Sequence, residues 1–138
     1  MNDESQQKRF KDITAADIKQ ECLLIEDLIE VSNEKKALTI VAYLMASLIL
    51  EKTLRHILYL EYKTITKIKF SVLIDKAFQN NWIDLEKATQ FRKLKDFRNA
   101  SVHHGLITIM DKETLMPINE IVQQITYLLD NYSPLKEC

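Results

Sequence analysis

The chain has 138 residues, of which 46% are hydrophobic and 28% are charged, and its formal net charge is −1. This length suffices for one domain with a single core. One glycine and two prolines leave few places for turns, which favours a helical bundle over a sheet protein, and the near-neutral charge gives no sign of tight nonspecific binding to duplex DNA.

The N-terminal residues and the cysteines predict a cytoplasmic protein. Residues 1–12 are polar and charged, so no signal peptide is expected. The longest apolar stretch, residues 37–50, is too short to span a bilayer and predicts a buried helix. Cys22 and Cys138 have neither metal-site nor disulfide spacing, which indicates a reducing compartment.

Five helices are expected in one domain over residues 14–132, between polar tails at 1–13 and 133–138. In chain order they are predicted over residues 14–31, 34–62, 71–80, 84–104 and 117–131. Thr14 and Asp17 form a capping-box pattern, Asp84 is a predicted N-cap, and Pro117 suits the first turn of the last helix. Residues 63–69 form a basic connector, and either a short hairpin or an irregular crossover fits residues 106–116.

Helical spacing also predicts the side chains that face the core. Trp82 and Ile83 are expected to anchor the turn between the third and fourth helices, which we favour over base stacking by Trp82, and His56 is expected to be structural. The predicted core positions are Ile18, Cys22, Ile25 and Ile29; Leu38, Val41, Leu44, Met45, Leu48, Leu54 and Leu58; Leu73, Ile74, Ala77 and Phe78; and Ile118, Ile121, Val122, Ile125, Leu128 and Leu129.

The most informative residues lie near the end of the fourth helix, where a charge interrupts an apolar face. At 100° per residue, Phe91, Leu94 and Val102 fall within about 40° of Arg98, where a purely structural helix would place a leucine or isoleucine. Asn99 and His103 are four residues apart and therefore lie on one flank. Residues 52–98 carry a net charge of +6 and residues 1–34 a net charge of −5, so a polyanion such as RNA is compatible with the basic segment.

The pattern Arg98-Asn99-x-x-x-His103 resembles the Arg-x(4–6)-His signature of the HEPN superfamily, the higher eukaryotes and prokaryotes nucleotide-binding domains. The resemblance implies a compact all-α domain. It also implies a metal-independent endoribonuclease, as in many HEPN toxins and phage-defence proteins. In that reading His103 is the acid/base, Arg98 binds the phosphate oxygens, and Asn99 orients His103 or contacts the phosphate. Additional substrate contacts are expected from Arg92, Lys95 and His104.

The resemblance also implies a homodimer. On one helix Arg98 and His103 point about 140° apart, which hinders convergence on one phosphate, whereas a two-fold axis along the signature helix would bring both subunits' residues to a shared cleft. Phe91, Leu94 and Val102 would then form the dimer contact. No cofactor and no metal are expected, because adjacent histidines such as His103 and His104 point apart on a helix.

Two further observations favour a noncatalytic alternative. HEPN toxins that are silenced by a nucleotidyltransferase carry a tyrosine two residues after the signature histidine, where this chain has Gly105. The late Arg/Asn/His cluster also resembles the mannitol operon repressor family, whose members are helical regulators. The alternative is therefore a regulatory or binding module that dimerises or docks a partner protein, such as an antitoxin, without sequence-specific DNA binding.

Overall fold

The computed structural model describes residues 14–32, 36–58, 68–104 and 115–132, and every regular element in these ranges is a helix. The helices are α2 (Ala15–Ser32), α3 (Lys36–Leu58), α4 (Phe70–Gln79), α5 (Leu85–His104) and α6 (Ile118–Tyr132). The predicted all-α bundle of five helices is confirmed, and four of the helices match the predicted bounds to within one residue. The predicted tails, most of both connectors and the outer ends of the predicted second helix lie outside the described residues.

The helix ends follow from local hydrogen bonds. Thr14 and Asp17 form a reciprocal capping box, in which each side chain accepts a hydrogen bond from the other's backbone N–H, at 3.0 and 3.2 Å. Asp84 caps α5 by accepting a hydrogen bond from the Lys87 backbone N–H at 2.8 Å. Between α4 and α5, Asn81 takes a positive φ of 64°, a conformation that asparagine tolerates better than most residues other than glycine.

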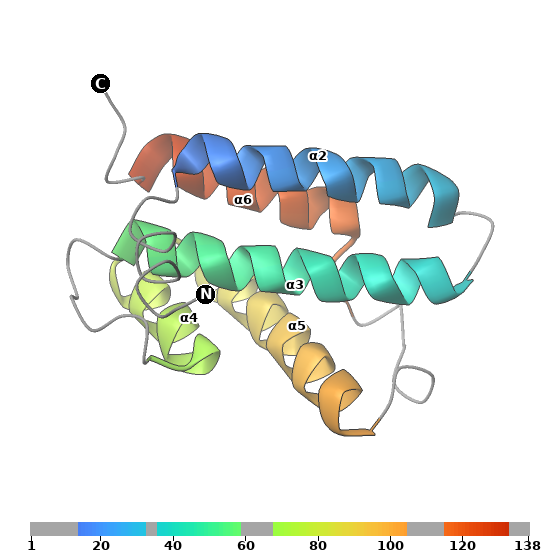
Figure 1. The fold of residues 1–138 in the computed structure, drawn as a ribbon. Helices are drawn as coiled ribbons and strands as arrows, with labels where there is room; N and C mark the ends of the chain where they lie inside the picture. The colour runs from blue at the N-terminus through green and yellow to red at the C-terminus, as the bar shows by residue number, and fades with distance from the viewer. Residues whose placement is uncertain (1–13, 33–35, 59–67, 105–114, 133–138) are drawn as a thin grey trace, which may run out of the picture.

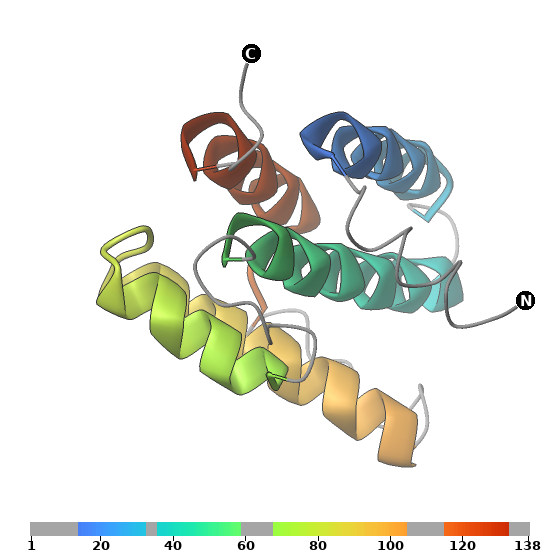
Figure 2. The ribbon, with the colours of Figure 1, turned by 60° about the vertical axis from the view of Figure 1, so that its left-hand side comes forward.

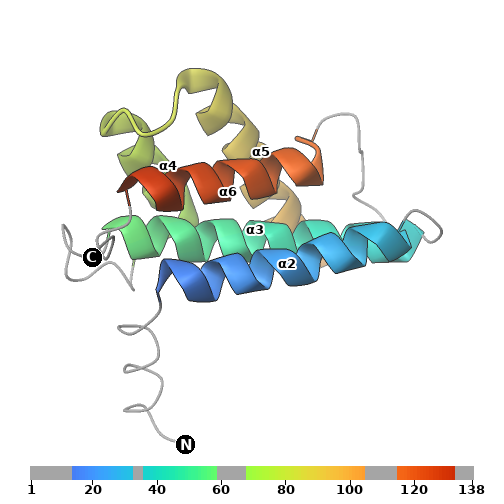
Figure 3. The same ribbon diagram turned by 90° about the horizontal axis from the view of Figure 1, so that it is seen from above.

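Helix α3 lies at the centre of the bundle and contacts each of the other four helices. Helices α2 and α6 lie side by side along one side of α3, and α4 and α5 lie on the other (Figures 1 and 2). Seen from above, α2, α3 and α6 run roughly parallel to one another, and α4 and α5 project beyond α6 (Figure 3). A salt bridge of 2.6 Å between Lys19 and Asp130 joins the start of α2 to the end of α6, as expected for antiparallel neighbours.

The core contains side chains from every helix, and the predicted inner faces of α2 and α6 are largely confirmed. Burial of a large aliphatic or aromatic side chain contributes about 1.5–3 kcal/mol, so this cluster accounts for most of the stabilisation. The largest fully buried side chains are Ile18, Ile25, Leu50, Leu54, Leu58, Leu73, Ile74, Phe91, Leu94, Ile121 and Ile125.

Two of the predicted core positions are wrong. Leu48 of α3 has 52% of its surface exposed, and Phe78 of α4 is also exposed. Helix α3 is apolar on nearly all sides between Ala37 and Leu50, so its periodicity did not indicate which side faces the neighbouring helices. The side that does so instead carries Ile40, Tyr43 and Leu50, all of which are buried.

His56 and Cys22 both lie in the interior of the bundle. His56 is buried, in agreement with the structural role predicted for it. Cys22 is buried and its thiol is free; burial, and then the nearby charges of Glu26 and Glu21, raise the pKa of this thiol to about 11. The thiol is therefore protonated and unreactive near neutral pH. Among the described helices, none combines the length and apolar character that crossing a bilayer requires.

Candidate functional site around Arg98 and Glu51

Arg98 extends from the inner side of α5 into a largely buried position. Leu94 and Phe91, one and two turns earlier, are fully buried, and only 19% of the Arg98 side chain is exposed. The predicted placement of a charge within the apolar face is thus confirmed. A guanidinium so far removed from water requires hydrogen-bonding partners.

The main partner is Glu51 of α3, 47 positions earlier in the chain, whose carboxylate accepts a hydrogen bond from Arg98 Nη1 and forms a salt bridge with it. Arg98 Nη2 donates to Asn99 Oδ1 at 3.3 Å. The guanidinium carbon lies 5.0 Å from the centroid of the Phe70 ring, within the range of a cation–π interaction. Three kinds of contact therefore fix the direction of the Arg98 side chain.

A second arginine shares the same carboxylate. Arg55, one turn after Glu51 on α3, forms a salt bridge with it, and its Nη1 donates a hydrogen bond of 2.7 Å to the Ile68 carbonyl just before α4. The side chains of Arg55 and Glu51 are 18% and 15% exposed. Two guanidiniums therefore share the Glu51 carboxylate where α3, the start of α4 and α5 meet. We call Glu51, Arg55, Phe70, Arg98 and Asn99 the Arg98 cluster.

Glu51, Arg55 and Phe70 were not predicted as site residues. The sequence contains one partial signal, because Glu51 ends the apolar stretch of the second helix and Arg55 follows it at the i,i+4 spacing of a helical ion pair. That spacing alone does not indicate a partner 47 positions away. Only the packing of α5 against α3 brings Arg98 to the same carboxylate.

Of the other predicted site residues, one contacts Arg98 and two form salt bridges elsewhere. Asn99 accepts a hydrogen bond from Arg98, and its expected contact with His103 or the phosphate stays a prediction. Arg92 instead forms a salt bridge of 2.9 Å with Asp75 on α4, and Lys95 forms one of 2.6 Å with Asp96. Much of the basic charge before the signature is therefore paired with carboxylates. The backbone of α5 includes His103 and His104, but their side chains lie outside the described residues.

The predicted dimer contact through Phe91, Leu94 and Val102 is wrong for its first two residues. Phe91 and Leu94 are not accessible to a neighbouring molecule, because both side chains have 0% exposure within a single chain. They face the core where α5 packs on α4 and α3. The side chain of Val102 lies outside the described residues. Any contact between two copies must use other side chains.

Comparison with known proteins adds no relative, since no family model, no curated protein and no solved structure matches this chain. Within the ranges that the structure describes, no three histidine, cysteine or carboxylate side chains gather as metal ligands.

Proposed function

We propose that this chain is an endoribonuclease that cleaves RNA without a metal ion, as its resemblance to HEPN domains implies. The observation that carries the proposal is the largely buried guanidinium of Arg98, held between Glu51, Asn99 and Phe70. Only some of the five guanidinium N–H donors are used by these contacts. The others can bind phosphate oxygens, and a side chain that is already oriented loses little entropy in doing so.

The proposed reaction needs only groups of the RNA and of this chain. The ribose 2′-oxygen attacks the adjacent phosphorus, and the bond to the 5′-oxygen of the next nucleotide breaks, leaving a 2′,3′-cyclic phosphate and a 5′-hydroxyl. Arg98 stabilises the additional negative charge on the phosphorane oxygens. His103, one helical turn after Asn99, removes the 2′-OH proton or donates one to the leaving oxygen, because an imidazole changes charge near neutral pH.

The test is cleavage of a single-stranded RNA in EDTA by wild type and by His103→Ala. We expect the substitution to reduce the rate by about 100-fold or more, which is typical for loss of a general acid or base. Lys93→Ala, an exposed position on the same helix, is the matched control and should cleave at the wild-type rate. Equal rates for wild type and His103→Ala would assign the cleavage to a contaminant. They would leave the Arg98 cluster as a device that holds three helices in a noncatalytic module.

We further propose that the active form is a two-fold dimer, because Arg98 and His103 diverge on one helix. One exposed leucine lies close to the Arg98 cluster. Leu48 is one turn before Glu51 on α3 and has 52% of its surface exposed, so it offers an apolar contact next to the cluster.

Light scattering at tens of micromolar protein tests this contact. Wild type should have the mass of two chains, and Leu48→Glu should have the mass of one, because a carboxylate would have to lose its water in the interface. Glu86→Gln on the exposed start of α5 is the control and should remain dimeric. A monomeric wild type that still cleaves RNA would rule out the shared cleft.

The biological setting follows from the proposed chemistry. An RNA-cleaving protein of this size fits a toxin or phage-defence effector in the cytoplasm, kept inactive by a partner protein. Growth arrest on expression, relieved by His103→Ala, is the expected cellular result. If wild type does not arrest growth and does not cleave RNA, a regulatory module that resembles the mannitol operon repressors becomes the better description.

A further inference from the structure

A second feature of the surface lies far from the Arg98 cluster. A cavity of about 420 Å³ lies between the turn that joins α4 to α5 and the outer side of α6. This volume falls within the range of small-molecule pockets in proteins. The cavity lies at the first turn of α5, whereas Arg98 is more than three turns further along the helix, a rise of about 20 Å.

One side of the cavity is formed by aromatic rings that are held by contacts with a third ring. Trp82 stacks on Tyr132 with ring centroids 5.1 Å apart, and Tyr132 meets Tyr127 edge to face at 6.2 Å. A hydrogen bond with Tyr127 also raises the pKa of the Tyr132 hydroxyl. Tyr132 thus holds the two cavity-lining rings, those of Trp82 and Tyr127, in place. The buried side chain of Ile83 supplies an apolar floor between them and the opposite side.

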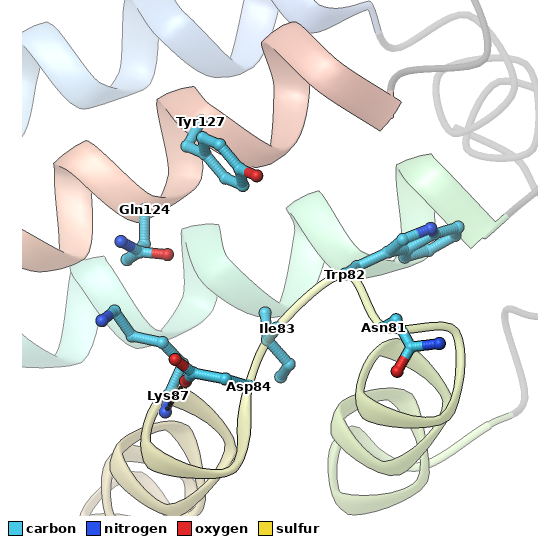
Figure 4. Close-up of a pocket in the computed structure, with 7 residues that line it drawn as sticks. All are labelled: Asn81, Trp82, Ile83, Asp84, Lys87, Gln124 and Tyr127. Carbon is cyan, nitrogen blue, oxygen red and sulfur yellow. Dashed lines mark hydrogen bonds between the residues drawn. The ribbon is translucent and has the colours of Figure 1, made fainter.

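The opposite side of the cavity is polar. Lys87 and Gln124 lie on that side of the cavity, and Trp82 lies on the other, with Ile83 between them (Figure 4). Within the described part of the chain, Lys87 forms no salt bridge, in contrast to six other basic side chains that pair with carboxylates, those of Lys19, Lys52, Arg55, Arg92, Lys95 and Arg98. The nearby Asp84 carboxylate already accepts the Lys87 backbone N–H as the helix cap.

We propose that this cavity binds a small aromatic molecule that carries one anionic group. The ring would lie on Ile83 against Tyr127 and Trp82, and the anion would reach the ammonium of Lys87 and the amide of Gln124. Aromatic walls and an apolar floor favour a planar ring, and an unpaired ammonium favours an anion. The Asp84 carboxylate beside Lys87 limits the favourable charge, so a monoanion fits better than a polyanion such as RNA.

Trp82 is the single tryptophan of the chain, so intrinsic fluorescence reports directly on this cavity. The probes are the monoanions phenylacetate and benzenesulfonate, titrated into full-length protein, with inorganic phosphate and benzyl alcohol as controls that lack the ring or the charge. Both aromatic anions should change the fluorescence saturably. Inorganic phosphate should produce no change, and benzyl alcohol should bind at least about 10-fold more weakly, the equivalent of one ion pair.

Lys87→Gln and Lys93→Gln form a matched pair of variants, since both remove one positive charge from α5, the first inside the cavity and the second on exposed surface outside it. Lys87→Gln should weaken binding of the aromatic anions about 10-fold, and Lys93→Gln should bind like wild type. Both should melt like wild type and should leave RNA cleavage unchanged, which separates this inference from the proposed function. Absence of a saturable change with wild type, or equal binding by Lys87→Gln, would overturn the proposal.

Discussion

Arg98→Leu is expected to remove RNA cleavage while leaving the fold nearly as stable as wild type. Glu51 keeps its second partner, Arg55, so the substitution leaves no carboxylate without a cation. The leucine would lie next to Phe70 on a side of α5 that is otherwise apolar. Replacing a largely buried charge by a hydrophobic residue is often neutral or stabilising, so the free energy of unfolding should change by less than about 1 kcal/mol.

Activity should respond differently, because loss of a donor to the transition-state oxygens typically costs about 100-fold to 1000-fold in rate. Urea unfolding and RNA cleavage in EDTA, measured on the same preparations, give both values. Lys93→Leu, on the exposed side of the same helix, should keep the wild-type free energy of unfolding and the wild-type cleavage rate. A variant Arg98→Leu that cleaves RNA at the wild-type rate would contradict the role given to the guanidinium. A variant that loses several kcal/mol would show that the ion pair is chiefly structural.

Glu51→Ala is expected to lose stability as well as cleavage, whereas Arg98→Leu is expected to lose cleavage alone. The substitution leaves two largely buried guanidiniums, Arg55 and Arg98, without their shared carboxylate. Removing one member of a buried ion pair costs about 3–5 kcal/mol, and partial exposure reduces this to about 1–3 kcal/mol here. Cleavage should fall because Arg98 loses the contact that orients it.

Glu21→Ala is the matched control, since Glu21 also joins two helices by a salt bridge but is 36% exposed. Its loss should cost less than about 1 kcal/mol and should not change cleavage. The double variant Glu51→Ala with Arg98→Leu should recover part of the stability lost in Glu51→Ala, because one unpaired charge is then removed. Equal losses for Glu51→Ala and Glu21→Ala in urea unfolding would contradict the importance assigned to the shared carboxylate.

The helices could be predicted from the sequence where local signals were strong. The Thr14–Asp17 box, the Asp84 cap and the apolar periodicity of 118–132 involve residues within one or two turns of each other, and all three are confirmed. Helix α3 shows the limit of this approach. Its apolar residues occur on nearly every side, so the wrong side was assigned to the core at Leu48, and tertiary packing decides its orientation.

The site could be predicted only in part, for a related reason. Arg98 was recognisable because a charge within an apolar face is unusual along a single helix, and Asn99 follows it directly. Glu51 and Arg55 come from another helix, and nothing in their own neighbourhood indicates Arg98. Arg92 was expected at the substrate, yet Asp75, on α4, forms a salt bridge with it. Charge pairs between helices depend on packing and not on local pattern.

The most direct measurement of the central claim uses two RNAs of the same sequence. The first is all ribose and serves to map the bond that the wild-type protein cleaves in EDTA; the second has a single 2′-deoxynucleotide on the 5′ side of that bond. The proposed reaction predicts a 2′,3′-cyclic phosphate from the first RNA and no cleavage at the substituted position of the second. Cleavage at the deoxynucleotide, or cleavage that EDTA abolishes, would contradict attack by the 2′-oxygen in a metal-independent site.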